Sequence, residues 1–240
     1  MQTVFKPYKK EFDHSYAFGA FPTIELVKAR PRDVVKVLAR TDYREEGVFS
    51  LSDLCMENGV ELEYNDRLVE RLSPKENCFV VGVFRKYACA LNPAAPHVAL
   101  DNPGNMGNLG TIIRTMLGFS VSNLAIIGGG ADILDPKVVR ASMGALFNIN
   151  FSCFENIEQY CAAYSGRDMY PFMLGGTQTL DSLAPRQDKP YTLIFGNEAT
   201  GLDARYASVG QSVVIRHSDA IDSLNLSIAV GLALYEFTKK

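Results

Sequence analysis

The chain has 240 residues, 47% of them hydrophobic and 21% charged, and a formal net charge of −3, so we expect one large or two modest globular domains. No apolar run approaches the ~20 residues that span a bilayer, and residues 1–10 are polar and basic, which excludes membrane and secreted classes and favours a soluble, cytoplasmic protein. The five cysteines are odd in number and contain no CxxC pair. They argue against a disulfide framework or a zinc site, and we expect no metal.

Positive charge is concentrated near the N-terminus. Residues 1–40 hold eight Lys and Arg against four Asp and Glu, a local charge of +4 that leaves −7 for the other 200 residues. A polyanion would therefore meet this end first, where Lys28, Arg30 and Arg32 lie. An ordinary solvated charged face explains the same pattern, and charge alone does not separate the two.

The first part of the chain alternates predicted helices and strands. A helix is predicted over 23–29, where Arg30-Pro31 ends it, and a buried strand follows over 34–38. The patterns that follow predict a helix, a strand, a second helix and a second strand, over 52–58, 60–64, 66–72 and 78–84. We expect a small α/β sandwich over residues 1–91.

A break with two prolines, Asn92-Pro93-Ala94-Ala95-Pro96, predicts a domain boundary. Beyond it, strands are predicted at 98–100, 124–127, 172–174, 192–195 and 213–215, and helices at 109–117, 156–164 and 224–237. Connections of this length imply a mainly parallel sheet with helices on both faces, over residues 97–240. The last helix has one apolar face, formed by Leu224, Ile228, Leu232 and Tyr235.

Three segments rich in glycine and polar residues follow or open these elements: 104–110 with Arg114, 195–202, and 222–227. Ligand sites of open parallel sheets lie outside the carboxyl ends of the strands. We therefore expect the three segments to build one site.

The first segment suits an anion, because free N–H groups at a helix start would face the crevice. Gly104, Gly107 and Gly110 form G-x-x-G-x-x-G, which is not the dinucleotide fingerprint, and no Gly-Lys-Ser/Thr phosphate loop is present. A nicotinamide enzyme or an NTPase is thus disfavoured, although Asp132 could imitate the ribose-binding acid of a Rossmann protein. Arg114, expected on the inner part of its helix, could hold a phosphate or a carboxylate, while a surface salt bridge is the commoner role.

The other two segments leave alternatives open. Gly196 would let a flat ligand approach the backbone, and Glu198 is equally a ligand contact, a partner for Arg114 or a simple loop carboxylate. Ser223 fits a helix N-cap, whereas Asn225 has the donor and acceptor capacity to read a ligand at the helix start.

Taken together, the segments resemble the SpoU (TrmH-like) family of SPOUT methyltransferases, which transfer methyl from S-adenosylmethionine to ribose 2′-hydroxyls of RNA. The resemblance covers residues 97–240 and rests on three motifs, at 108–114, 194–202 and 222–229. More weakly, the front part looks like the small RNA-binding domain of many family members. The resemblance implies a trefoil knot in the C-terminal domain and homodimers with sites at the subunit interface.

The resemblance also implies roles for individual residues. For catalysis these are Arg114, Asn108, Glu198, Ser223 and Asn225. For binding the cofactor S-adenosylmethionine they are Thr177, Gly196, Asn197, Gly201, Ile215, Arg216, Leu224 and Asn225. Because a guanidinium is permanently charged, we favour Arg114 as a clamp on a neighbouring phosphate that also stabilises the emerging alkoxide, rather than as the base.

One loop departs from the family pattern. Where relatives usually have Ile-Pro-Met, this chain has Ile215-Arg216-His217-Ser218-Asp219, and the more polar loop would alter the affinity for the cofactor. We interpret His217 as a loop histidine rather than a general base, because nothing else in the sequence positions it. Our hypothesis is a methyltransferase acting on a ribose 2′-hydroxyl of rRNA or tRNA; the alternative is an RNA-binding protein of the same fold that transfers no methyl group.

Overall fold

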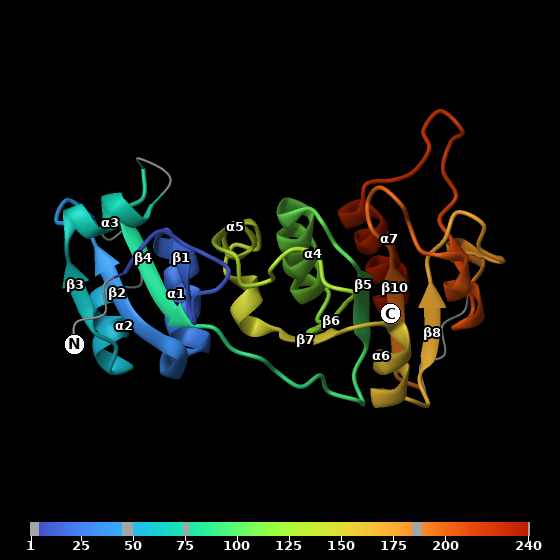
Figure 1. Ribbon diagram of the computed structural model, residues 1–240, viewed down its shortest axis with the longest axis horizontal. Coiled ribbons are helices and arrows are strands. Elements are labelled where there is room, and N and C mark those ends of the chain that lie inside the picture. The colour runs from blue at the N-terminus through green and yellow to red at the C-terminus, as the bar shows by residue number, and fades with distance from the viewer. Residues whose placement is uncertain (1–4, 45–49, 74–76, 184–188, 240) are drawn as a thin grey trace. The chain divides into compact units, whose positions relative to one another are not determined.

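The computed structural model describes residues 5–44, 50–73, 77–183 and 189–239. The chain divides into two compact units (Figure 1). The first holds Met1–Tyr87 and Asp132–Asn148, and the second holds Ala88–Ala131 and Ile149–Lys240. Within the described ranges, no helix has the length and apolar character needed to cross a membrane.

The first unit is built on a four-stranded sheet in the order β1-β4-β2-β3, in which β4 is antiparallel to both of its neighbours. The strands are β1 (His14–Phe18), β2 (Val34–Ala39), β3 (Leu62–Tyr64) and β4 (Val80–Arg85). The helices are α1 (Ala20–Ala29), α2 (Leu51–Glu57), α3 (Asp66–Leu72) and α5 (Pro136–Ala141). Successive residues of β2 point to opposite faces of the sheet and so enter two different cores. Val37 packs with α1 and α2, and Leu38 packs with α3.

Residues 132–148 were expected in the second domain, but they pack with the first unit. The ring of Phe147 meets that of Phe84 edge-on, with centroids 5.2 Å apart. The hydroxyl of Ser15 donates to the carbonyl of Leu134 at 2.5 Å. Phe84 and Phe147 are 63 positions apart in the chain, and Ser15 and Leu134 are 119 apart. No local sequence pattern could therefore assign this segment to the first unit.

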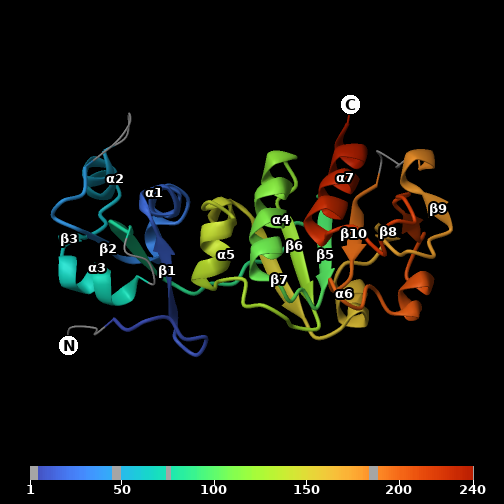
Figure 2. The same cartoon turned by 90° about the horizontal axis from the view of Figure 1, so that it is seen from above.

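The second unit contains a five-stranded parallel sheet in the order β7-β6-β5-β10-β8. A mainly parallel sheet was expected, but β7 and β8 were not among the expected strands. The strands are β5 (His97–Asp101), β6 (Asn123–Ile127), β7 (Asn150–Phe154), β8 (Asp168–Pro171) and β10 (Tyr191–Phe195). The helices are α4 (Met106–Gly118), α6 (Ile157–Ala163) and α7 (Leu226–Thr238). The helices α4 and α7 lie side by side on one face and α6 covers the other (Figure 2).

Two predicted strands are displaced from the main sheet. The strand expected at 172–174 ends earlier, as β8, and the one expected at 213–215 is β11 (Val213–Val214), which pairs with β9 (Gln178–Thr179) in a separate two-stranded sheet. Both segments instead line the cavity described below. Their apolar side chains face that cavity. A prediction from the spacing of apolar residues cannot tell a cavity wall from the core of a sheet.

The apolar face predicted on the last helix is its exposed face. Ile228, Leu232 and Tyr235 are 55%, 43% and 61% exposed. The side chains that α7 buries are Leu226, Val230, Ala233, Leu234 and Phe237. The helix is apolar nearly all round, so its sequence alone does not reveal which side meets the sheet.

Candidate functional site

The loops that follow β5 and β10 are joined by hydrogen bonds. The carboxylate of Glu198 accepts from the backbone N–H groups of Gly104 and Asn105, each at 3.2 Å. The side-chain amide of Asn197 donates to the carbonyl of Asn102 at 2.8 Å. The site expected at the carboxyl ends of parallel strands is therefore built by neighbouring strands of this sheet.

The side chain of Asn108 connects all three predicted motifs. Its Nδ2 donates to Glu198 at 3.2 Å, and its Oδ1 accepts from Nδ2 of Asn225 at 3.2 Å. Asn108 lies in the first turn of α4, after the N-cap Asn105, and Asn225 is itself the N-cap of α7. The expected N-cap, Ser223, lies two residues earlier and lines the cavity instead. The three motifs thus meet where two helices begin side by side.

This environment keeps Glu198 ionised. Burial by itself raises the pKa of the carboxyl, but hydrogen bonds from its own backbone N–H, from Asn108 and from the amides of Gly104 and Asn105 outweigh it and lower the pKa below its usual range. The N-terminus of α4 adds the positive end of a helix dipole beside the same carboxylate. The structure gives Glu198 a role that the three alternatives did not include, as the hydrogen-bond acceptor that holds the first loop.

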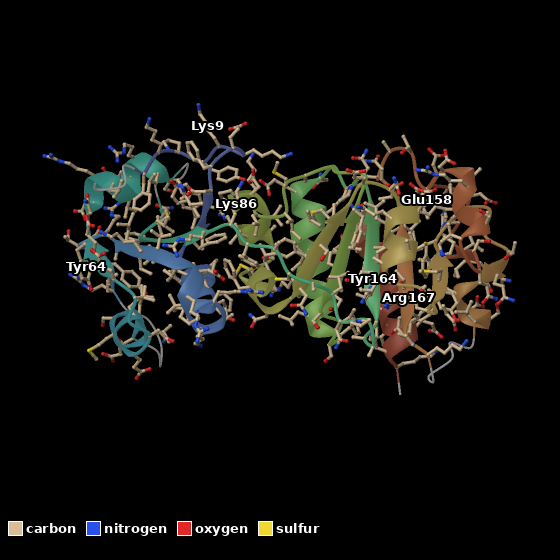
Figure 3. The ribbon with its side chains drawn as sticks, turned by 60° about the horizontal axis from the view of Figure 1, so that its bottom comes forward. Lys9, Tyr64, Lys86, Glu158, Tyr164 and Arg167 are labelled. Carbon is tan, nitrogen blue, oxygen red and sulfur yellow. The ribbon has the colours of Figure 1, made fainter. Side chains whose placement is uncertain are left out.

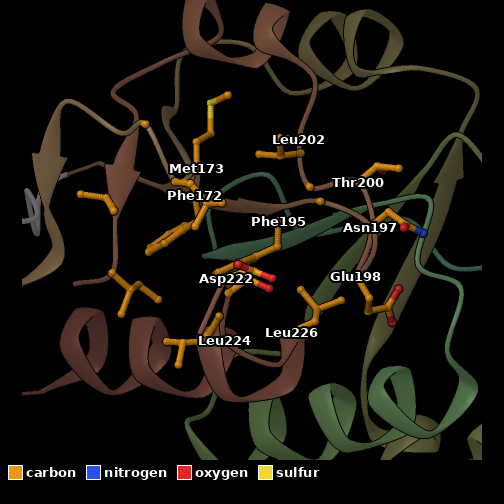
Figure 4. A pocket seen from close by; sticks show the side chains of 18 of the residues that line it. Phe172, Met173, Phe195, Asn197, Glu198, Thr200, Leu202, Asp222, Leu224 and Leu226 are labelled. Atoms are coloured by element: carbon orange, nitrogen blue, oxygen red, sulfur yellow. The ribbon is translucent and has the colours of Figure 1, made fainter. Parts of the chain in front are cut away.

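A cavity of about 440 Å³ opens beside this network (Figure 4). Its lining comes from the loops after β8, β10 and β11 and from the start of α7: residues 172–175, 195–202, 213–215, 217, 222–224, 226 and 229. Phe172 and Phe195 stack in it with ring centroids 4.4 Å apart and planes at 14°. Figure 4 shows Leu224 and Leu226 on the side opposite Met173. A largely apolar cavity with a few polar groups is typical of a small-molecule site.

Glycines let two backbones meet at the wall of this cavity. A Cβ on Gly196 would lie 2.2 Å from the carbonyl carbon of Gly201. The loop between them is closed by the N–H of Gly201, which donates to the carbonyl of Asn197 at 2.9 Å. The group that comes close to Gly196 is therefore the backbone of its own loop. From the sequence, a flat ligand was expected at this place.

The structure places the predicted cofactor-binding residues in two groups. Those that line the cavity are Gly196, Asn197, Gly201, Ile215 and Leu224. Thr177, Arg216 and Asn225 are exposed and lie outside the lining. The hydroxyl of Thr177 lies 3.2 Å from that of Ser212, which ties together the segments that lead into β9 and β11. His217 lines the cavity, with Nδ1 2.9 Å from the carbonyl of Ile215.

Arg114 is exposed on α4 and lies outside the cavity lining, not on the inner part of the helix. The inner side is filled by Leu109, Ile112, Ile113 and Met116. Among the residues that the structure describes, the guanidinium of Arg114 has no hydrogen-bond or ion-pair partner, so the surface salt bridge weighed from the sequence does not form within them.

Asp132 does not imitate a ribose-binding acid, because it is engaged within the first unit. It accepts a hydrogen bond from the hydroxyl of Tyr8 at 2.5 Å and forms an ion pair with Lys86 at 3.0 Å. Across the described part of the chain, no group of three or more His, Cys, Asp and Glu side chains is placed to hold a metal ion.

Sequence reasoning missed part of the cavity lining. Phe172, Met173 and Leu174 line the cavity but were expected in a strand of the sheet, and Asp222, which opens the expected segment 222–227, had no role of its own assigned. The signal that could have found the first three is their place after β8, because the rule that sites follow the carboxyl ends of strands applies to every strand of the sheet.

Comparison with known proteins agrees with the motifs. The model of the SpoU rRNA Methylase family matches residues 95–235. The chain is 29% identical over 147 residues to a 23S rRNA (adenosine(1067)-2'-O)-methyltransferase of Streptomyces laurentii, and 30% identical over 154 residues to a 23S rRNA (uridine(2479)-2'-O)-methyltransferase of Streptomyces viridochromogenes. Each match covers 60% of this chain, and 54% and 52% of the relatives, so the chain spans about half the length of the curated relatives it matches.

The fold is similar to that of an AdoMet-bound rRNA methyltransferase from Sinorhizobium meliloti. The TM-score is 0.78 at 25% sequence identity, and the similarity covers 94% of this chain and 87% of that one.

Proposed function

Since this chain belongs to the SpoU rRNA methylase family, we propose that it transfers the methyl group of S-adenosylmethionine to a ribose 2′-hydroxyl of rRNA or tRNA. The observation that carries the proposal is the hydrogen-bonded chain from Asn225 through Asn108 to Glu198 at the edge of an apolar cavity. It joins the three family motifs at one place.

The cavity fits S-adenosylmethionine in size and charge. Its volume of about 440 Å³ lies in the usual range of ~300–1,000 Å³ for ligand sites. Two carboxylates, Glu198 and Asp222, line it, and no Lys or Arg among the described residues does. Negative charge suits the sulfonium cation of this cofactor. When bound, the cofactor supplies an electrophilic methyl carbon; Gly196, Ile215 and Leu224 would hold it largely through their backbones.

The protein's own residues have to align the ribose oxygen and help one proton to leave. Asn108 and Asn225 present amide groups at the junction of α4 and α7 and would orient the ribose. Glu198 holds the loop at Gly104 and Asn105 in place through its ionised carboxylate. Arg114 would clamp the phosphate beside the ribose and stabilise the emerging alkoxide, because its guanidinium is permanently charged.

We propose that the working form is a homodimer and that α7 is part of its interface. The exposed apolar residues Ile228, Leu232 and Tyr235 recur at helical spacing along this helix, and the ring of Phe119 at the end of α4 lies edge-on to Tyr235 with centroids 6.4 Å apart. Such a patch marks an interaction surface, and a second copy can cover it symmetrically. Since α7 begins at the site, this interface would lie beside the site, as the family resemblance implies.

We also propose that the second unit is knotted as a trefoil and that the protein works in the cytoplasm, where it would meet its RNA. The knot is proposed from the family, and the segments that would form it pack tightly: a Cβ on Gly176 would lie 2.4 Å from the carbonyl carbon of Val213, and one on Gly210 would lie 2.1 Å from the carbonyl oxygen of Met169. Stretching single molecules tests the knot, because a tightened knot leaves the chain shorter than its full contour length.

The decisive experiment incubates the purified protein with tritium-labelled S-adenosylmethionine and rRNA or tRNA. We expect label in RNA and resistance of the modified linkage to alkaline hydrolysis, which requires a free 2′-hydroxyl. Calorimetry with S-adenosylmethionine near a millimolar distinguishes the methyltransferase from the alternative, an RNA-binding protein that transfers no methyl group. No heat of binding and no transfer, with RNA binding retained, would replace the enzyme by an RNA-binding protein of the same fold. Mapping of ribose methylations missing from cells without the protein would identify the nucleotide.

A further inference from the structure

The basic residues of the first unit are not equally available to a partner. Lys36, Arg40 and Arg30, which give residues 1–40 much of their positive charge, lie 2.7, 2.8 and 3.8 Å from carboxylate oxygens. The guanidinium of Arg30 also lies over the ring of Tyr87, 4.2 Å from its centroid. Much of the basic stretch that the sequence offered as a polyanion surface is therefore compensated inside the unit.

A second set of cations in the same unit is exposed and forms no ion pair among the described residues. It comprises Lys6, Lys9 and Lys10 of the segment that precedes β1, Arg71 of α3 and Arg85 of β4. These five residues are called the arm surface below. They are neighbours in space: Nη2 of Arg71 donates to the carbonyl of Phe5 at 3.1 Å, and Arg85 pairs with His14 across β1 and β4.

The segment that carries the three lysines is fixed by its backbone. Phe5 is 6% exposed and packs in the core between α3 and the sheet. The hydroxyl of Tyr16 donates to the carbonyl of Lys6 at 2.5 Å, and the ammonium of Lys86 donates to that of Lys10 at 2.8 Å. The carbonyls of the segment are thus bound by the unit, and the ammonium groups remain exposed, as Figure 3 shows for Lys9. Ordering of the backbone before binding lowers the entropic cost of association.

Few negative charges oppose this surface. Lys86 is compensated by Asp132 and adds no net charge. Two exposed acids, Glu11 and Asp13, lie in the same segment, and Asp13 is bonded to Nδ1 of His14 at 2.8 Å. The five cations therefore keep a net charge of about +3, an electrostatic excess that suits a chain of phosphates.

An aromatic ring accompanies the cations. Phe12 is half-buried and stacks on the imidazole of His14, with centroids 5.2 Å apart and planes at 14°. Rings beside lysines and arginines are the combination with which proteins hold single-stranded RNA, because the cations follow the phosphates and the rings accept bases.

We propose that the arm surface, rather than Lys28, Arg30 and Arg32, is the main phosphate-contacting surface for the RNA substrate. The proposal rests on the proposed function, since it assigns the place where the methylated RNA is held. Each neutralised phosphate lowers the slope of log K against log salt by about 0.7–0.9, so three lysines govern about two units of that slope.

The test compares two full-length triple variants for binding of an in vitro 23S rRNA transcript between 50 and 300 mM salt. The first is Lys6→Gln/Lys9→Gln/Lys10→Gln. The matched control, Lys28→Gln/Arg32→Gln/Arg44→Gln, removes the same charge from exposed side chains elsewhere in the unit. We expect the first variant to lose on the order of 10–100-fold in affinity near 0.1 M salt, with a slope about two units shallower, and the control to change by less than about threefold.

Two outcomes overturn the proposal, and they differ from failure of the proposed function. Equal slopes in the arm variant and the parent protein would move the RNA surface elsewhere. A larger loss in the control would return it to Lys28 and Arg32. If the parent protein itself neither binds nor methylates RNA, the proposed function fails, and binding of S-adenosylmethionine shows separately whether the second unit is intact.

Discussion

The side-chain amide of Asn108 and the carboxylate of Glu198 are hydrogen-bonded at 3.2 Å although 90 positions separate them in the chain. Asn108 lies in the first turn of α4, after β5, and Glu198 lies in the loop after β10, the parallel neighbour of β5. The same carboxylate accepts from two backbone N–H groups of the first loop, at Gly104 and Asn105. Glu198 is thus the acceptor on which the position of the first motif depends.

Replacement of Glu198 is expected to loosen this loop. In Glu198→Ala three donors lose their charged acceptor and turn to water, and we expect methyl transfer to fall on the order of 10–100-fold, since a hydrogen bond to a charged group contributes about 1.5–3 kcal/mol. Glu198→Gln keeps one oxygen and should fall less. Glu155→Gln, an exposed loop carboxylate in the same unit, is the control and should keep the parent rate. Transfer of labelled methyl to RNA measures all three, and an unimpaired Glu198→Ala would contradict the assignment.

The acid dependence of stability gives a separate test of Glu198. Its pKa is lowered in the folded state from the ordinary 4.5, so its stabilising effect is present above pH 4.5 and is lost as the pH falls through the folded value. Melting temperatures of the parent and of Glu198→Gln should therefore differ by a constant amount at neutral pH and converge below pH 4.5. A gap that stays constant to pH 3 would show that ionisation of Glu198 does not stabilise the fold.

Gly196→Ala is expected to damage the cavity. The added methyl would lie 2.2 Å from the backbone of Gly201, so the loop has to move. We expect a loss of about 2–3 kcal/mol in the free energy of unfolding and at least tenfold weaker binding of S-adenosylmethionine by calorimetry. Gly175→Ala is the matched control, because Gly175 also lines the cavity but a Cβ there meets no atom within 4 Å. Equal binding by both variants would count against a tight crossing at Gly196.

Arg114→Ala should abolish methyl transfer while the melting temperature and the affinity for S-adenosylmethionine stay close to the parent values. The side chain is exposed and has no polar partner within the part of the chain described, so its removal costs little stability. Arg114→Lys should recover only part of the activity, since an ammonium lacks the planar fork that grips a phosphate. Full activity in Arg114→Ala would refute the clamp.

Stability should decline in mild acid because of His97. Burial, and secondarily the charge of Arg167, lowers the pKa of this imidazole from 6.5 to about 4. The unfolded chain then binds the proton more readily, so this contribution is complete above pH 6.5 and declines by about 3 kcal/mol as the pH falls to 4. Urea unfolding between pH 4 and 7 measures it. In His97→Gln the slope over this range should flatten, and an unchanged slope would assign it to other groups.

A charge on the exposed face of α7 should separate the proposed dimer. Leu232 is 43% exposed and lies within the apolar patch, so Leu232→Glu would bring two carboxylates into a symmetric interface. We expect light scattering to give a dimer for the parent protein and a monomer for this variant. Met56→Glu, which adds the same charge at an exposed position of α2, should remain dimeric. A monomeric parent protein would remove the basis for this interface.

The folding pattern of the second unit could be predicted because its signals are local. Apolar runs separated by helical spacing require crossover connections, and these give a parallel sheet whose carboxyl ends carry the loops. Helix starts were predicted only approximately: the helices expected from residues 109 and 224 begin at 106 and 226, and Asn225 rather than Ser223 caps α7. Strand ends could not be predicted in the same way. Residues 172–174 leave the sheet and line the cavity, but their sequence is as apolar as that of a strand.

The sequence by itself therefore determined three things: the three motifs, the parallel sheet whose strands they follow, and the family. Only the tertiary structure decided the partners. It joined Asn108 to Glu198, placed Arg114 outside the cavity, and set the exposed lysines before β1 apart from compensated cations such as Lys36. The physical reason is range: helix caps, turns and periodicity depend on residues a few positions apart, whereas ion pairs and hydrogen bonds between loops depend on residues that meet only when the chain is folded.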